Sequence, residues 1–306
     1  MSATTFSTAG ISRRDFIRTG IAGTAILATR PTLFAAEPEA EVWMIHGDDK
    51  AKLMTQALKV VDQNGGLGTN VKTLALKVNA AWARKPERGA TTHPTLIKTF
   101  LEGCQARGIT KTVVPENPCV RAEHSFTRSG IQEVVEAAGS TMIDLKSEKK
   151  RFADVNIPNG KNLRKAEVAR DFLEADAVVN MPIAKHHGGA KLTMALKNWM
   201  GAVWDRGYWH RNNLHQCIAD FGSFMKPNWT IIDATRIMLT RGPQGPTRDM
   251  KHPNLLILSK DQVAADSVAT LLFHDSPYEI PFLKFADDMG IGVVSPDRIT
   301  VHKVEA

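Results

Sequence analysis

The fold is decided where the sequence reads VKTLALKVN at residues 71–79 and, after a segment of helical spacing, KTVVPE at residues 111–116. The segment between these two apolar runs contains THPTLIKTFLEGCQARG at residues 92–108. Pro94 is favourable at a first helical position, and Gly108 is favourable just after a helix end. This order predicts two parallel strands joined by a crossover helix.

The same alternation continues along the chain on both sides. Further strands are predicted at residues 42–46, 141–145, 177–180, 230–233 and 255–258. Further helices are predicted at residues 131–138, 192–203 and 263–272. Strands that alternate with helices indicate an α/β fold, with a mainly parallel sheet flanked by helices in Rossmann-like layers. Neither an internal repeat nor a linker divides the sequence after residue 36, so residues 37–306 are expected to form a single domain.

The first 36 residues have a different character. SRRDFIR at residues 12–18 is followed by a short apolar stretch at residues 20–29 and by small residues near Ala36. This is the layout of a secretory signal, and the adjacent Arg13 and Arg14 indicate the twin-arginine (Tat) type. The sequence therefore predicts a signal at residues 1–36 that is read by the Tat translocation machinery. The mature chain is expected in the periplasm or another extracytoplasmic compartment.

Composition narrows the class of protein further. The chain has 306 residues, 43% of them hydrophobic, and a net charge of +7. The apolar stretch near the N-terminus is about half of the roughly 20 residues that span a bilayer, so we expect no stable transmembrane segment in the mature protein. Clustered Lys and Arg with interleaved aromatic residues are absent from the sequence, so nucleic-acid binding is not expected. Three widely spaced cysteines without a CxxC pair argue against an iron–sulfur cluster.

Polar groups follow six of the predicted strands at the point where each strand ends. They are His46, Asn79 with Lys77 just before it, Glu116, Asp144, Asn180 and Asp233. A single such residue often caps a helix or begins a turn. In open parallel sheets, however, ligands bind outside the carboxyl ends of the strands, so the six together predict a site at that edge.

The stretch NMPIAKHHGGAKLTMALKN at residues 180–198 adds positive charge to this edge. Gly188 and Gly189 permit close backbone approach, and the following segment is predicted to be a helix, whose free N-terminal amides attract anions. We therefore expect a carboxylate or phosphate to bind there. The predicted substrate-binding residues are Lys77, Asn79, Lys185, Gly188, Gly189, Lys197 and Asn198.

Three residues are candidates for proton transfer. Glu116 or Asp233 is suited to the role because a carboxylate beside lysines at a strand end can exchange a proton with a ligand. His187 is the alternative base.

Two residues on predicted helices have more than one interpretation. A buried Lys197 could act as a base or form an imine, although pairing with Asp233 or Glu116 is favoured. Asp266 lies within an otherwise apolar helix, where a charge is unusual unless it is paired or functional. A structural role, with Lys260 or Lys284 as the partner, is slightly favoured over a role in chemistry.

A divalent metal is the alternative to an anion site. His187, His210, His215 and Asp220 offer imidazole and carboxylate ligands, but without a tight motif such as HExxH. The aromatic and ionisable residues at 204–215 are typical of a lid or pocket wall. The loop at residues 240–252 is interpreted equally well as a flap over the site or as a solvated loop.

A series of short motifs resembles the family called domain of unknown function 362. In order they are KVN (77–79), THP (92–94), VPENP (114–118), VVNMPIAKHH (178–187), LTMALKNWMG (192–201), IIDAT (231–235) and SKDQVAADSVA (259–269). The resemblance covers residues 72–299 and implies that certain polar positions recur in the family. These are Lys77, Asn79, Glu116, Lys185, His187, Lys197, Asn198, Asp233 and Asp266. Members sometimes accompany iron–sulfur modules, but this sequence has no ferredoxin-like run of cysteines.

The first hypothesis from the sequence is an exported enzyme that acts on a small anionic substrate. The alternatives are a periplasmic module that binds a metal ion or an anion without changing it, and an accessory protein of a redox complex. The sequence specifies no cofactor.

Overall fold

The fold is built on one large sheet. The structure, a computed structural model, describes residues 39–306, so the predicted signal with Arg13 and Arg14 lies outside the described residues. The sheet contains eleven strands, eight of which form the path β13-β1-β12-β10-β7-β2-β3-β4. Along that path β12 runs antiparallel to both of its neighbours, and all other neighbouring pairs are parallel. The predicted α/β fold with a mainly parallel sheet is confirmed.

The strands of this path are β1 (Ala40–His46), β2 (Thr73–Val78), β3 (Lys111–Glu116), β4 (Thr141–Asp144), β7 (Ala177–Met181), β10 (Trp229–Met238), β12 (Leu255–Ser259) and β13 (Ile299–Glu305). Three short strands extend the sheet beside β10: β8 (Ile183–His187), β9 (Lys191–Thr193) and β11 (Met250–Lys251). A separate hairpin is formed by β5 (Phe152–Asn156) and β6 (Lys165–Ala169).

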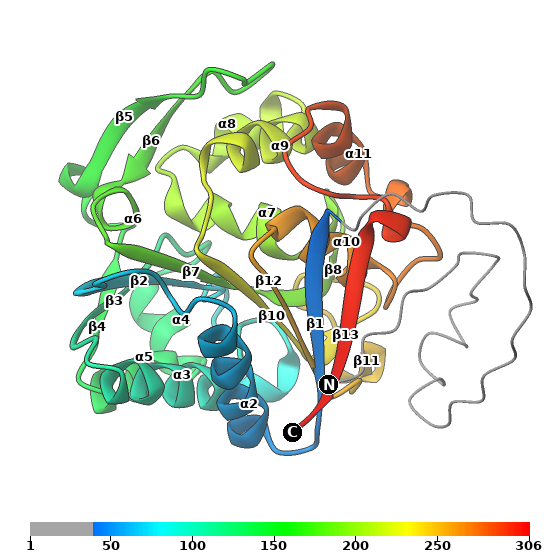
Figure 1. Cartoon of the computed structure of the whole chain (residues 1–306). Coiled ribbons are helices and arrows are strands. Elements are labelled where there is room, and N and C mark those ends of the chain that lie inside the picture. The colour runs from blue at the N-terminus through cyan, green and yellow to red at the C-terminus, as the bar shows by residue number, and fades with distance from the viewer. Residues whose placement is uncertain (1–38) are drawn as a thin grey trace, which may run out of the picture.

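Helices cover both faces of the sheet (Figure 1). One face carries α2 (Lys50–Gln63), α3 (Pro94–Ala106), α4 (Ala122–Arg128) and α5 (Ile131–Ala137). The other carries α7 (Ala195–Asn198), α8 (Arg206–Arg211), α9 (Leu214–Phe224), α10 (Gln262–Thr270) and α11 (Pro281–Asp288), and α6 (Arg170–Leu173) precedes β7. Short 3-10 helices lie at Pro86–Arg88, Lys149–Arg151, Trp199–Ala202, Thr247–Asp249, Pro277–Glu279 and Pro296–Arg298. Each face buries its own apolar cluster, as expected for a sheet covered on both sides.

The unit β2–α3–β3 follows the sequence pattern closely. His93 is the N-cap of α3 and Pro94 is its first residue. Leu96, Ile97 and Phe100 are buried against the sheet. The two strands then pair in parallel, with Ala75 opposite Val113. As a result, the residues that follow β2 and β3 lie at the same edge of the sheet.

The helix predicted at residues 192–203 is wrong in its first part. After Gly188 and Gly189 the chain returns as β9, which pairs antiparallel with β8. Lys191 adopts a positive φ of 61°, which suits a tight turn and not a helix start. The two glycines therefore form the turn of a β-hairpin, and only the four residues of α7 are α-helical in this region.

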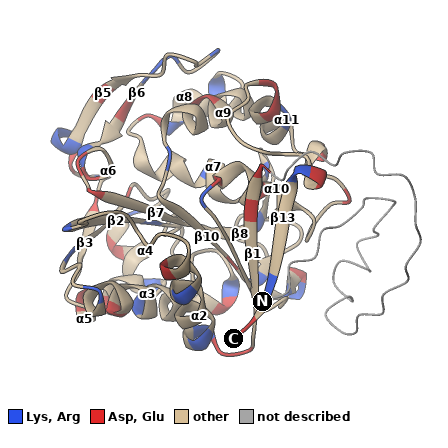
Figure 2. Cartoon of the chain, in the orientation of Figure 1, with Lys and Arg blue, Asp and Glu red and all other residues tan. Residues whose placement is uncertain are grey.

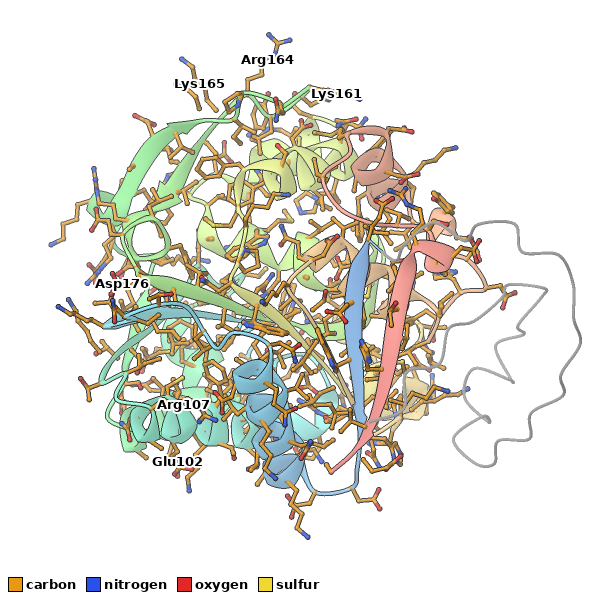
Figure 3. All side chains as sticks on the ribbon, in the orientation of Figure 1. Glu102, Arg107, Lys161, Arg164, Lys165 and Asp176 are labelled. Carbon is orange, nitrogen blue, oxygen red and sulfur yellow. The ribbon has the colours of Figure 1, made fainter. Side chains whose placement is uncertain are left out.

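The β5–β6 hairpin was not predicted from the sequence. Basic residues occupy both of its ends (Figure 2). Figure 3 shows Lys161, Arg164 and Lys165 directed outward from the turn of the hairpin, into solvent. Between residues 39 and 306, no helix is both long enough and apolar enough to cross a bilayer.

Candidate functional site

The carboxyl ends of the central strands bring several of the predicted residues together, but not all six strand-end groups. Asn79, Glu116 and Asn180 belong to one connected set of buried side chains. His46 is instead paired with Glu305 at the exposed edge of the sheet. Asp144 stabilises a turn by accepting a hydrogen bond from the Lys146 amide at 2.8 Å. The expectation of six convergent groups is therefore wrong for these two, because β1 and β4 lie toward opposite ends of the sheet.

A buried ion pair lies at the centre of the set. The Lys77 amine donates to Glu116 Oε2 at 2.9 Å, and both side chains are almost fully buried. The Ala80 amide donates to the same oxygen at 2.9 Å. Burial lowers the pKa of Lys77, although the Glu116 carboxylate opposes that shift. Glu116 is thus already neutralised by an internal partner.

Three buried asparagines are joined by hydrogen bonds next to this ion pair. Asn198 donates to Asn180 Oδ1 at 2.9 Å and accepts from Asn79 Nδ2 at 3.0 Å. Asn79 Oδ1 in turn accepts from the Lys185 amine at 3.1 Å. Because every buried amide in this set has a partner, the network holds α7 against β2 and β7.

Asp233 is saturated with donors. It accepts hydrogen bonds from the His93 amide, the Thr235 amide and hydroxyl, and the Arg236 guanidinium, the last at 2.7 Å. Burial alone would raise the pKa of Asp233, yet the charge of Arg236 and these hydrogen bonds hold it below the usual value. A carboxylate with this many fixed donors remains ionised, so we assign Asp233 a structural role instead of the proton transfer expected from the sequence.

Asp266 has a different partner from the one expected. It contacts neither Lys260 nor Lys284 through a hydrogen bond in the described chain; its two oxygens accept from the Ala195 and Leu196 amides at 2.6 and 2.9 Å. These amides are the first two of α7, which has no side-chain cap of its own. Asp266 therefore caps α7 from another helix.

The site contains more buried lysines than carboxylates that could pair with them. Lys197, 8% exposed, forms no hydrogen bond or ion pair with any residue of the described range 39–306, contrary to the expected pairing with Asp233 or Glu116. Burial lowers the pKa of Lys197 to about 8; the nearby Cys119 opposes this shift, and the charge of Arg206 adds to it. Burial lowers the pKa of Lys185 to about 7, with the charge of Lys197 as the next cause. Lys77, Lys185, Lys197 and Arg206 thus form one group of neighbouring cations, in which only Lys77 is paired with Glu116.

Arg206 and Cys119 form the exposed border of this group. The Arg206 guanidinium donates to the Asn117 carbonyl at 2.7 Å and lies 3.5 Å from the Cys119 sulfur. Cys119 is exposed, whereas Cys104 and Cys217 are buried. Cys119 is therefore the exposed thiol that lies next to this group of cations.

His187 has a defined tautomer. Its Nδ1 accepts hydrogen bonds from the Gly189 and Ala190 amides, both at 3.1 Å, so the ring proton resides on Nε2. Burial and the charges of Lys197 and Lys185 lower its pKa to about 3. A neutral ring of this tautomer has a free hydrogen-bond donor at Nε2. Of the two glycine amides that were expected to hold an anion, the one of Gly189 is thus occupied by His187.

The predicted metal ligands are not assembled. Within residues 39–306, no group of three or more His, Cys, Asp or Glu is arranged to hold a metal ion. Asp220 is buried and accepts from the Asn162 and Leu163 amides at 2.7 and 2.8 Å. His215 stacks on Phe282. Three of the four predicted ligands, His187, His215 and Asp220, thus make other contacts.

A cavity of about 260 Å³ lies outside this site, between the β5–β6 hairpin and α8. Asp154, Glu167 and Asp205 line it together with Tyr208 and Trp209. Two of these carboxylates form ion pairs, Glu167 with Lys149 and Asp205 with Arg211. The lining of this cavity thus carries acidic side chains, in contrast to the cationic group at the carboxyl ends of the strands.

Sequence reasoning missed Gly201 and Arg236. A Cβ on Gly201 would overlap Glu116 Oε1 and lie 2.7 Å from the Lys77 amine, so the ion pair requires a glycine there. Arg236 follows Asp233 by three residues on β10 and pairs with it. The three-residue spacing between Asp233 and Arg236 could have indicated this pair from the sequence, whereas no local pattern indicates the role of Gly201.

These features define a mixed α/β protein with a buried, predominantly cationic site at the carboxyl edge of its sheet. The chain belongs to the family described as domain of unknown function (DUF362), whose sequence profile matches residues 74–270. A thylakoid-associated protein of Synechocystis sp. is 23% identical over 256 residues, which are 79% of this chain and 77% of that protein. The lactate racemase apoprotein from Thermoanaerobacterium thermosaccharolyticum is similar with a TM-score of 0.45 and 12% identity; the match covers 72% of this chain and about half (54%) of the racemase chain.

Proposed function

We propose that this protein is an enzyme that binds a small anion, a carboxylate or a phosphate, at the cluster of Lys77, Lys185, Lys197 and Arg206. The observation that carries the proposal is the charge balance: Glu116 pairs with Lys77, and the neighbouring Lys185, Lys197 and Arg206 have no carboxylate partner among the residues described. An unpaired buried cation is costly, and an anion from solution would compensate it.

The lowered pKa values of two lysines also support an anion site. The pKa values of Lys185 and Lys197 are lowered because burial and like charges disfavour their ammonium forms. A bound anion would offset the repulsion between these like charges. The ligand would then be stabilised by charge-assisted hydrogen bonds in a site with little water.

Thermal unfolding in the presence of anions tests the binding step. Phosphate, sulfate and small carboxylates should raise the melting temperature of the wild-type protein, because they bind the folded state only. Lys197→Met should abolish this rise while leaving the ligand-free protein at least as stable, since it removes an uncompensated charge. Lys98→Met is the matched control: Lys98 pairs with Glu102, whose side chain points outward from α3 (Figure 3). Equal stabilisation of all three proteins by the anions would count against the site.

Chemical labelling of Cys119 tests whether the anion binds next to this residue. Cys119 is the exposed one of the three cysteines, so iodoacetamide should modify it first. A bound anion should slow this reaction, because Cys119 borders the cationic cluster through Arg206. Unchanged labelling at an anion concentration that stabilises the protein would place the anion elsewhere.

Turnover separates an enzyme from a binding module. Organic acids and phosphates that stabilise the protein should be converted by the wild-type protein and not by Lys197→Met. Stabilisation without conversion of any of them would favour the alternative, a protein that binds an anion and does not transform it.

Export by the Tat route remains part of the proposal. The supports are SRRDFIR at residues 12–18 and a relative whose name places it at the thylakoid. Replacing Arg13 and Arg14 together by lysine should leave the chain in the cytoplasm of its host, which cell fractionation would detect. Unchanged fractionation of the double variant would exclude a twin-arginine signal.

A further inference from the structure

We propose that Lys197 is a nucleophile that forms an imine with a carbonyl compound bearing a carboxylate, such as a 2-oxo acid. This inference rests on the proposed anion site and names its substrate class. Its basis is the position of one amine that is buried, lacks an acceptor and borders the accessible side of the cluster.

The three buried lysines differ in what their amines contact. Lys77 donates to Glu116 and to the Val78 carbonyl. Lys185 donates to Asn79 and to the Ala90 carbonyl. Lys197 has no such acceptor within the described residues, and its side chain keeps 8% exposure where the other two have 0 and 1%. Its nitrogen lone pair is therefore the one that a substrate carbon can reach.

The backbone around Lys197 is fixed on both sides. Asp266 holds the amides of Ala195 and Leu196, and Asn198 is locked between Asn79 and Asn180. Lys197 lies between these two anchors on α7. A nucleophile on such a rigid element reaches its partner with less loss of conformational freedom.

The surroundings favour the neutral amine that the reaction needs. Carboxylate partners are absent from the Lys197 side chain in the described part of the chain, and Arg206 and Lys185 add positive charge nearby. Desolvation beside other cations is a known way to activate a lysine for imine formation. The same cations would attract the carboxylate of the substrate.

The reaction balances without any further reagent. The Lys197 nitrogen attacks the carbonyl carbon, and a proton moves from nitrogen to oxygen to give a carbinolamine. The carbon–oxygen bond then breaks, one water leaves, and the carbon–nitrogen double bond forms. The Nε2–H of His187 is a hydrogen-bond donor available to the departing oxygen, since its Nδ1 is occupied by backbone amides.

Reductive trapping tests this chemistry on the purified full-length protein. Pyruvate and sodium cyanoborohydride should together increase the protein mass by that of the probe less one oxygen atom, and peptide analysis should place the adduct on Lys197. Acetone lacks the carboxylate and should react about tenfold more slowly, the effect of one favourable charge contact. Lys197→Arg should lose the adduct but keep its stabilisation by sulfate, because the charge is retained.

The outcomes separate the two proposals. If sulfate and pyruvate stabilise the protein but no adduct forms on Lys197, the imine is overturned and the anion site stands. Trapping of Lys197 at the rate of the exposed Lys98 would also overturn it. If neither anion binds, both proposals fail.

Discussion

The site depends on a few residues whose neighbours leave no room for substitution. Gly201 is the clearest case, because its α-carbon lies directly beside the Lys77–Glu116 pair and its carbonyl accepts from the Asn117 amide at 2.8 Å. Its φ is not in the left-handed region, so the requirement is one of space and not of backbone conformation. Glycine is thus needed here because a buried ion pair occupies the volume of a Cβ.

Gly201→Ala should therefore separate Lys77 from Glu116. Breaking a buried ion pair costs about 3–5 kcal/mol because a charge is left uncompensated, and urea unfolding should show a loss of this order. Gly188→Ala is the control, since a Cβ at Gly188 would meet nothing within 4 Å. Its stability should stay within about 0.5 kcal/mol of the wild type. Equal losses in the two variants would contradict this account of Gly201.

Among the secondary-structure elements, α7 is the one that carries both Lys197 and Asn198 of the site. It is only four residues long, too short to be stable by itself, and it is capped by Asp266 of α10. Burial raises the pKa of Asp266 to about 7, while the two amides of α7 oppose the shift. The position of Lys197 and Asn198 is therefore set by a contact between helices distant in sequence.

This contact makes a prediction for stability as a function of pH. Asp266 has a folded pKa above its ordinary value of 3.8, so the stability linked to its protonation is present below about pH 4 and is lost as the pH rises to about 7. Asp266→Asn cannot titrate, and its free energy of unfolding should lack this decline. The free energy of unfolding of the wild type minus that of the variant, measured by urea unfolding from about pH 4 to 8, should fall over that interval and then level off. A constant difference would show that Asp266 does not titrate there.

Asp266→Asn should also weaken the site itself. An asparagine offers one acceptor oxygen to the two amides and places its own NH₂ against the other, so one bond is lost at a cost of about 1–3 kcal/mol. Stabilisation of the variant by sulfate should also decrease, because the weaker cap no longer holds α7, and with it Lys197, in place. Full retention of sulfate stabilisation in a folded Asp266→Asn protein would show that the cap does not position Lys197.

For the whole molecule, charge is distributed unevenly. The turn of the β5–β6 hairpin carries Lys161, Arg164 and Lys165 outward into solvent (Figure 3). In contrast, Lys77, Lys185 and Lys197 at the carboxyl edge of the sheet are buried. Solvent and salt screen the first group but not the second. Anion binding should therefore be controlled by the enclosed lysines.

Anion affinity should consequently increase as the pH falls. Lys197 and Lys185, with pKa values of about 8 and 7, take up protons below these values, and each added charge strengthens binding. Sulfate is the probe because its own charge is constant, and calorimetry in buffers of different ionisation enthalpy should detect proton uptake between about pH 6 and 9. Lys197→Met should remove the upper part of this dependence. Affinity that is independent of pH would exclude both lysines from the site.

Much of the fold could be predicted from the sequence because its signals are local. The runs at 71–79 and 111–116 became β2 and β3, and the segment beginning at Pro94 became α3, since periodicity and capping act over a few residues. Local signals failed at Gly188 and Gly189, where the pairing of β8 with β10 and β9 outweighed the helical spacing of the following residues.

The α/β class, the family and the presence of lysines and carboxylates near the strand ends can all be inferred from the order of residues. The pairing of these side chains follows from the folded arrangement: Lys77 pairs with Glu116, Arg236 pairs with Asp233, and Lys197 has no acceptor among the residues described. The physical reason is that burial and charge compensation depend on contacts between distant segments. Lys77 and Glu116 are 39 residues apart and Asp266 and Ala195 are 71 apart, and no local pattern encodes either contact.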